Sequence, residues 1–126
     1  MTAWWQFAEA EFRIEGHIKP YVRMTQRGKF VRRQAQEYLA SKQAIGLQLK
    51  QQMRDREMIP RQVPLCVRIQ FVHDRGWHNC DLDNQCKAVL DAAQGIVFED
   101  DRWVDELHAL RVAGEENVTL FIVESL

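Results

Sequence analysis

Alternating polar and apolar positions mark the first element of the chain. Near the N-terminus every second residue is small or apolar, and charged residues stand between most of them. The apolar set is Ala8, Ala10, Phe12 and Ile14. A two-residue period is that of a strand with one buried face. We therefore expect a strand that ends at Gly16, followed by a basic loop that Pro20 and Gly28 keep irregular.

A helical period replaces the alternation between about Arg32 and Arg56. Apolar residues recur there at three-, four- and seven-residue steps: Ala35, Tyr38, Leu39, Ile45, Leu49 and Met53. After Pro60 and Pro64 the two-residue period returns. The buried side of this second expected strand consists of Leu65, Val67, Ile69 and Phe71.

The second half of the chain predicts one more helix and two more strands. The helix follows Asp83 and ends at Gly95, and its apolar stripe is Cys86, Val89, Leu90 and Ala93. A third strand is expected over residues 104–112, and a turn over 114–117. The segment VTLFIVE predicts a fourth strand, apolar enough to be central or covered on both faces. The order β-α-β-α-β-β predicts an α+β fold with two helices packed on a small mixed sheet of about four strands.

Length and charge refine this picture. The 126 residues are expected to form one domain, residues 1–126. No apolar run approaches the ~18 residues of a membrane span, and the N-terminus lacks the features of a signal peptide. We therefore expect a cytoplasmic protein with no membrane partner. The stretch from Arg13 to Arg68 contains thirteen Lys or Arg and four Asp or Glu, whereas the rest of the chain contains four basic and fourteen acidic residues. This split suggests one surface for a polyanion and another for cations.

The three cysteines do not suggest a disulfide framework, because their number is odd and no C-x-x-C is present. Cys66 and Cys86 fall on apolar positions and are expected in the core. His73, His78 and Cys80 lie close in sequence and could bind zinc. No fourth ligand stands at a familiar spacing, so we favour ordinary loop residues for this group.

Acidic residues concentrate in the segment HNCDLDNQCKAVLDAAQG, residues 78–95. Asp81 and Asp83 are two apart, and in an extended segment such residues project to the same side, where they could share one ion. Asp83 or Asn84 could serve as the N-cap of the following helix. An Asp before a helix is usually only a cap, so this motif alone is weak evidence for a metal site.

The acidic residues continue along the expected helix and beyond it. Four residues share one polar helix face: Asp83, Lys87, Asp91 and Gln94. A lysine between two such aspartates commonly forms a surface ion-pair ladder, worth ~0.3–0.5 kcal/mol per pair. A second acidic group follows the helix after a short link that can fold it back: Glu99, Asp100 and Asp101.

Together the two acidic groups fit a site for Mg²⁺, which binds a few carboxylates and keeps several waters. Two such ions ~3.5–4 Å apart can hold the attacking and leaving oxygens of a phosphodiester displacement. Lys87 could offset the charge that develops on the phosphate oxygens, or hold the carboxylates in place.

At this point the sequence resembles a known family. The stretch DLDNQCKAVLDAAQGIVFEDDRWVDELHA is similar to the signature of RusA-type endodeoxyribonucleases, the Holliday junction resolvases common in bacteria and their prophages. It carries the D-L-D-N motif, a lysine three residues after the asparagine, a D-A-x-x-G turn and a D-D pair before a strand. Gln85 and Cys86 stand where the family often has apolar residues. The upstream segment KPYVRMTQRGKFV resembles the family's basic N-terminal loop more loosely.

The resemblance implies a homodimer that binds four-way DNA junctions and makes paired nicks with Mg²⁺ or Mn²⁺. The catalytic residues that it implies are Asp81, Asp83, Lys87 and Asp101, of which the three aspartates would bind the metal. The residues that match as supporting groups are Asn84, Asp91 and Asp100. A basic cluster beside such a site favours phosphate contacts over an ordinary solvated face: Lys19, Arg23, Arg27, Lys29, Arg32 and Arg33.

Other functions remain open at this level. The same chemistry could act on flaps, forks or structured RNA. The chain could instead be a non-catalytic protein that binds DNA structures, with an acidic cluster that is only a cap and a charge ladder. A glycosyltransferase D-x-D site fits poorly, because the chain is short and shows no phosphate-binding glycine loop. For Trp4 and Trp5 we favour a packing role.

Overall fold

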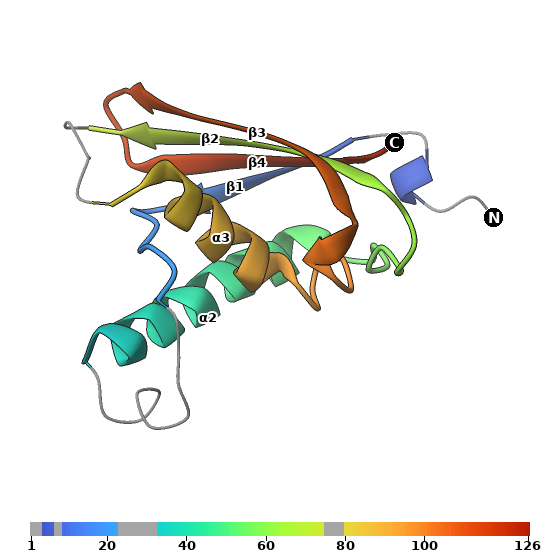
Figure 1. Cartoon of the computed structure of the whole chain (residues 1–126), viewed down its shortest axis with the longest axis horizontal. Helices are drawn as coiled ribbons and strands as arrows, with labels where there is room; N and C mark the ends of the chain where they lie inside the picture. The colour runs from blue at the N-terminus through green and yellow to red at the C-terminus, as the bar shows by residue number, and fades with distance from the viewer. Residues whose placement is uncertain (1–3, 7–8, 23–32, 75–79) are drawn as a thin grey trace.

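The computed structural model describes residues 4–6, 9–22, 33–74 and 80–126 (Figure 1). Its elements are η1 (Trp4–Gln6), β1 (Ala10–Glu15), α2 (Arg33–Met53), β2 (Leu65–His73), α3 (Leu82–Ala93), η2 (Asp101–Trp103), β3 (Val104–Ala113) and β4 (Val118–Ser125). The predicted order of two helices and four strands is confirmed. The prediction of one domain over 1–126 stays a prediction for the chain as a whole.

The four strands form one mixed sheet in the order β1-β4-β2-β3. β4 lies between β1 and β2 and is antiparallel to both, so the expectation of a central fourth strand is confirmed. β2 and β3 are parallel. A parallel pair needs a crossover connection, and α3 lies in that connection. In the chain, α3 therefore follows β2 and precedes β3, and it packs on one side of the sheet.

Both helices pack on the same side of the sheet (Figure 1). The sheet residues that face them alternate with exposed ones, as the two-residue period predicted: β1 reads buried–exposed three times over. The core is centred on fully buried Phe12, Phe121 and Val67, and the rings of Phe12 and Phe121 lie 5.7 Å apart. From α3 it receives Val89 and Ala93, both of them fully buried. The predicted apolar stripes of both helices are thus buried, except for Leu39, which is only partly buried.

The outer edge of β1 is covered by side chains of α2. The Gln52 side chain accepts from the Arg13 amide at 2.8 Å and donates to the Arg13 carbonyl at 2.7 Å. One turn earlier, Gln48 accepts from the amide of Glu15 at 2.8 Å. These bonds occupy backbone groups that an edge strand would otherwise offer to another chain.

The N-terminal tryptophans pack as expected. Trp4 and Trp5 are half-buried against the core. The indole N–H of Trp4 donates to the Glu57 carbonyl at 2.7 Å, and the hydroxyl of Ser125 donates to the Trp5 carbonyl at 2.8 Å. Among the helices that the structure describes, none has the length and apolar character that crossing a bilayer requires.

Candidate active site

The entrance to α3 differs from the sequence prediction. The N-cap is Asp81, with extended backbone angles (φ −73°, ψ 146°), and neither Asp83 nor Asn84 takes that position. The Asp81 carbonyl already accepts the first helical bond, from the Gln85 amide at 3.2 Å. Asp83 therefore lies inside the first turn. Contrary to the prediction, Asp81 and Asp83 do not share one side of an extended segment, because only Asp81 is extended and Asp83 is helical.

The carboxylates of this turn remain available for other roles. The Asp81 side chain makes no capping hydrogen bond and is exposed. Asp83 is also exposed, and one of its oxygens accepts from the Asn84 amide at 3.0 Å. A cap would have used the Asp81 carboxylate to satisfy a helix amide. In this structure that carboxylate faces solvent instead.

Arg111 of β3 holds the entrance to α3 in place. Its guanidinium donates to the side-chain oxygen of Gln85 at 3.0 Å and also to the carbonyl of Cys80. Buried Gln85 in turn donates to the Ile18 carbonyl at 3.3 Å. This network joins three separate segments of chain at the acidic motif. Sequence reasoning missed Arg111; its only signal was an arginine at a strand position whose neighbours along that face are apolar.

Lys87 does not form the ion-pair ladder that its spacing suggested. Its ammonium lies 5.1 Å from the centre of the Tyr21 ring. Within the described part of the chain, no carboxylate lies within 4.0 Å of that ammonium. The Tyr21 amide donates to the Asn84 carbonyl at 3.1 Å, so Tyr21 is itself fixed to the acidic motif. Lys87 is therefore an exposed cation beside the motif, and no carboxylate of the described residues neutralises it.

Asp91 is tied to α2 instead. The hydroxyl of Tyr38 donates to Asp91 Oδ2 at 2.6 Å, and the ammonium of Lys42 lies 3.3 Å from the same oxygen. Burial, followed by the hydrogen bond and the charge of Asp91, raises the pKa of Tyr38 above its ordinary value. Tyr38 therefore stays protonated and remains a donor to Asp91. The apolar stripe predicted Tyr38 as a core residue, and its hydroxyl contact was not foreseen.

Asp101 folds back to α3 after a short link, but at the end of the helix and not beside Asp81 and Asp83 as predicted. Its amide donates to the Gln94 side chain at 3.4 Å, and the Asp100 side chain caps η2 by accepting from the Arg102 amide at 3.0 Å. Burial raises the pKa of Asp101, and the charges of Asp100 and Asp91 raise it further. Asp101 is therefore harder to ionise than an ordinary aspartate.

The structure brings Asp101 to Asp91 and Asp100 rather than to Asp81 and Asp83. Asp83 and Asp91 are two turns apart on α3, or about 12 Å along its axis. Among the described residues, Asp81, Asp83 and Asp101 do not form a set of ligand atoms within 4.8 Å of one another. Binding of one ion by all three would require their side chains to move from these positions.

A hollow of about 490 Å³ lies between α3 and β3. It adjoins the acidic face, which consists of the acidic residues at α3 and η2: Asp81, Asp83, Asp91, Asp100 and Asp101. Its lining combines charged and apolar groups: Leu82, Asp83, Cys86, Lys87, Leu90, Leu107 and Ala109. Burial, and then the charge of Asp83, raises the pKa of Cys86 to about 11. Cys86 therefore lines the hollow as a neutral thiol, and no nucleophilic role is indicated for it.

The donor set of the acidic face suits a hard divalent cation. Its members offer carboxylate oxygens and neither sulfur nor imidazole, as Mg²⁺ and Mn²⁺ prefer. Burial raises the pKa of Asp101 and the charges of Asp100 and Asp91 raise it further, and a bound cation would favour its ionised form. The residues that are present therefore fit such an ion.

The predicted DNA-binding cluster is only partly described. Lys19 lies 3.8 Å from a carboxylate oxygen of Glu37, and Arg33 lies 3.0 Å from the other oxygen. Both basic side chains are exposed. The remaining members, Arg23, Arg27, Lys29 and Arg32, lie outside the described residues. His78 of the possible zinc group lies outside them as well.

Comparisons with known proteins now identify the family. A search of curated proteins finds no match. The family model described as endodeoxyribonuclease RusA matches residues 12–123 of the 126-residue chain. The matched region contains both helices, the acidic motif, Lys87, Asp101 and the strands that hold them. The chain therefore belongs to the RusA family of endodeoxyribonucleases, which are Holliday junction resolvases.

Proposed function

We propose that this protein is a metal-dependent endonuclease that resolves four-way DNA junctions by paired nicks. The observation that carries the proposal is the acidic face of α3 and η2, which lies inside the family match and holds a lysine that no described carboxylate neutralises. The proposed catalytic residues are Asp81, Asp83, Lys87 and Asp101. A binding protein without catalysis would have no need of crowded carboxylates on a surface that must meet phosphates.

The carboxylates of Asp81, Asp83 and Asp101 would hold Mg²⁺ or Mn²⁺. When bound, such an ion lowers the pKa of water and stabilises charge on the phosphate oxygens. Lys87 supplies a further positive charge next to these residues. Since no described carboxylate neutralises its ammonium, it is free to meet a phosphate oxygen as negative charge develops there.

Asp91 and Asp100 support the site, and the structure suggests how. Tyr38 and Lys42 hold Asp91 from α2, and Asp100 caps η2 and so sets the start of the turn that carries Asp101. Asn84 ties the acidic motif to the chain that leads into the basic loop, through the Tyr21 amide. These contacts would fix the backbone that carries the catalytic carboxylates, so that their side chains alone turn toward an arriving metal ion.

The polyanion surface would lie next to this site. Residues 18–22 lead into the basic cluster and are hydrogen bonded to the first turn of α3. We propose that Lys19, Arg23, Arg27, Lys29, Arg32 and Arg33 contact DNA phosphates. The shape of a branched junction would then decide recognition more than base sequence does. The homodimer and the cytoplasmic location also stay predictions.

The direct test is cleavage of a synthetic four-way junction. We expect the protein to nick opposing strands in the presence of Mg²⁺ or Mn²⁺ and to be inactive in EDTA. Asp81→Asn should lower the nicking rate by more than about 100-fold, since even losing a partner of a metal ligand commonly costs 10–100-fold. Junction binding should persist, because the amide has the same size and one negative charge fewer.

The matched control is Glu115→Gln, which removes one exposed carboxylate in the turn between β3 and β4, outside both α3 and η2. It should cut at the native rate. Native protein that leaves junctions intact with either metal would contradict the proposal. A panel of flaps, forks and structured RNA at the same ionic strength would then show whether another substrate is preferred.

A non-catalytic protein that binds DNA structures is the second candidate. The Asn84 amide bonded to Asp83 would then be only local helix structure. Calorimetry separates the two readily. The nuclease hypothesis expects Mg²⁺ or Mn²⁺ to bind native protein and to bind Asp83→Asn much more weakly. Equal heats for the two proteins would favour the non-catalytic candidate.

A further inference from the structure

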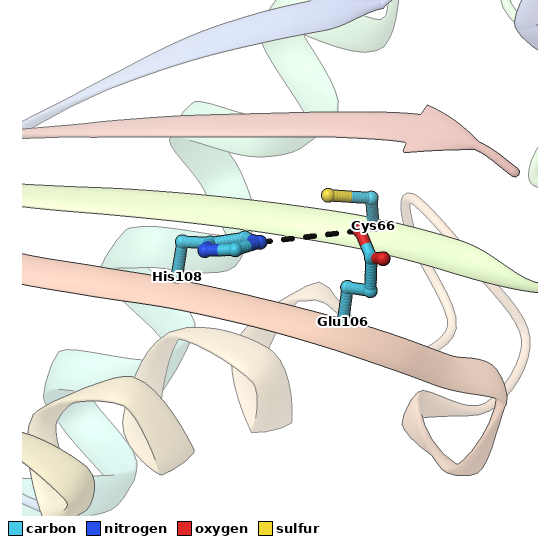
Figure 2. Close-up of side chains that lie close together, drawn as sticks. All are labelled: Cys66, Glu106 and His108. Carbon is cyan, nitrogen blue, oxygen red and sulfur yellow. Dashed lines mark ion pairs between the residues drawn. The ribbon is translucent and has the colours of Figure 1, made fainter.

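A second group of potential metal ligands lies on the sheet, apart from the acidic face. It consists of Cys66 on β2 with Glu106 and His108 on β3 (Figure 2). One ligand atom from each of the three lies within 4.8 Å of the others. Of the described residues, no other His, Cys, Asp and Glu form such a group. Figure 2 shows the imidazole of His108 and the Cys66 side chain converging on the Glu106 carboxylate.

The strand register explains why the three side chains meet. Cys66 lies opposite Glu106, and Arg68 lies opposite His108, in the parallel pair of β2 and β3. Residues two apart on a strand project to the same face. That face is the one turned away from α2 and α3, because Val67 and Ile69 on the other face are buried in the core. The ligand group is therefore built on two hydrogen-bonded strands rather than on a loop.

The chemistry of the group differs from that of the acidic face. A thiolate, an imidazole and a carboxylate form a donor set that suits Zn²⁺, with bond lengths of about 2.0–2.3 Å. Ligand atoms of a tetrahedral site with such bonds stand about 3.5 Å apart. His108 Nε2 and Glu106 Oε2 are already 3.9 Å apart. Only small side-chain movements would be needed to place an ion between them.

The charges around the group also favour a cation. Arg68 contacts two further carboxylates, at 3.5 Å from Glu9 and in a short hydrogen bond with Glu124. Among the ion pairs of the described residues, Glu106 pairs with His108 and not with Arg68. Glu124 lies opposite Cys66 on β4, so its carboxylate is within the same cross-strand row. Cys66 is buried, while the side chains of Glu106 and His108 are more than half exposed, which leaves an open approach for an ion.

We propose that Cys66, Glu106 and His108 bind one Zn²⁺ ion on the outer face of the sheet. Three protein ligands leave a fourth position, for water or for Glu124 after a rotation away from Arg68. On binding, a zinc–sulfur bond forms and the thiol proton passes to solvent. The ion would link β2 to β3 across the sheet. This inference is independent of the proposed nuclease activity, and it does not involve the acidic face.

Cobalt substitution of the purified full chain tests the site directly. Co²⁺ bound by a thiolate gives a near-ultraviolet charge-transfer band that oxygen-only sites cannot give. We expect this band at one Co²⁺ per chain, its loss when Zn²⁺ displaces Co²⁺, and a higher Tm with Zn²⁺. Asp81→Asn should retain all three results, which separates this test from that of the nuclease.

Variants assign the ligands. Cys66→Ser should abolish the band, and His108→Gln should weaken binding by at least about tenfold. His108 is exposed, so His108→Gln will fold even if Cys66→Ser does not. Cys80→Ser and Cys86→Ser are the matched thiol controls and should retain the band. A band that survives Cys66→Ser, binding unchanged in His108→Gln, or no band in native protein would each overturn the proposal. Loss of the band in Cys80→Ser would also overturn the proposal, and it would indicate that the metal binds near His73 and Cys80 instead.

Discussion

Asp101 is the residue whose ionisation most clearly reports the character of the acidic face. Its raised pKa arises from burial and from Asp100 and Asp91. A carboxyl whose folded-state pKa lies above its unfolded value favours folding at low pH, and that contribution is lost as pH rises through the folded pKa. At neutral pH, ionised Asp101 should therefore destabilise the metal-free protein.

Asp101→Asn should accordingly stabilise the protein in EDTA at neutral pH. The gain should be on the order of 0.5 kcal/mol, the usual scale for partly exposed charge pairs, or about 1–2 °C in Tm. At a pH below the ordinary Asp value of ~3.9, the two proteins should melt together. Thermal melts across this range check the sign, and a variant less stable than native at neutral pH would contradict it. Added Mg²⁺ should raise the Tm of native protein more than that of the variant.

Lys87 carries a separate prediction at the residue scale. Because its ammonium has an aromatic neighbour and no described carboxylate partner, replacement by Met should preserve the fold. We expect Lys87→Met to lower the single-turnover nicking rate by about 100-fold, the cost of losing one donor to developing negative charge. Junction affinity should fall much less. Lys42→Met, which removes the cation beside Asp91, is a matched lysine control and should reduce the rate less. Equal rates for native protein and Lys87→Met would remove Lys87 from the proposed mechanism.

At the scale of elements, the entrance to α3 depends on β3. Arg111 contacts both the Cys80 carbonyl and the Gln85 side chain, and a buried polar group left unpaired costs about 1–3 kcal/mol. Arg111→Met should therefore destabilise the chain by roughly that amount and reduce nicking, because the turn that carries Asp81 and Asp83 loses its support. Relative to native protein, Arg111→Met should speed up hydrogen exchange more for amides 81–86 than for the amides of β4. Arg102→Met is the control, since the backbone amide of Arg102, rather than its side chain, donates to Asp100. Unchanged exchange at the start of α3 would contradict the role of Arg111.

The elements also differ in how well their boundaries and contacts could be predicted from the sequence. The alternation in β1 and the stripes in both helices predicted the core correctly, because each depends on local periodicity. The start of α3 was predicted too late, because Asp81, Asp83 and Asn84 are all good caps and a residue 30 positions away, Arg111, holds the chain before Asp81. The link after Gly95 was expected to fold back, but spacing could not say that Asp101 stops beside Asp91. A local bond between Gly95 and Phe98 and long-range bonds of Ile59 with Val97 and Glu99 set that point, and the bonds of Ile59 join segments distant in sequence.

At the scale of the whole molecule, the two edges of the sheet differ. Gln48 and Gln52 cover the edge of β1, whereas β3 carries Leu107 and Leu110 at 45% and 47% exposure. Large apolar side chains exposed on an edge strand are unfavourable in a monomer, because water contacts them and another chain can pair with the strand. They would be buried if β3 and the adjoining hollow face a second copy, which is consistent with the predicted homodimer.

A mixed dimer tests both the assembly and the chemistry. Two opposed nicks require two active sites, so a plasmid carrying an extruded four-way junction should be linearised by native protein. Dimers that contain one native and one Asp81→Asn subunit should instead give mainly nicked circles, because one site cuts and the other binds without cutting. Light scattering should give twice the mass of the chain at the working concentration, and Leu107→Glu with Leu110→Glu should shift it toward the mass of one chain. If native protein linearises the plasmid as a monomer, the two cuts come from successive visits, and the paired-site mechanism is wrong even though the nuclease assignment stands.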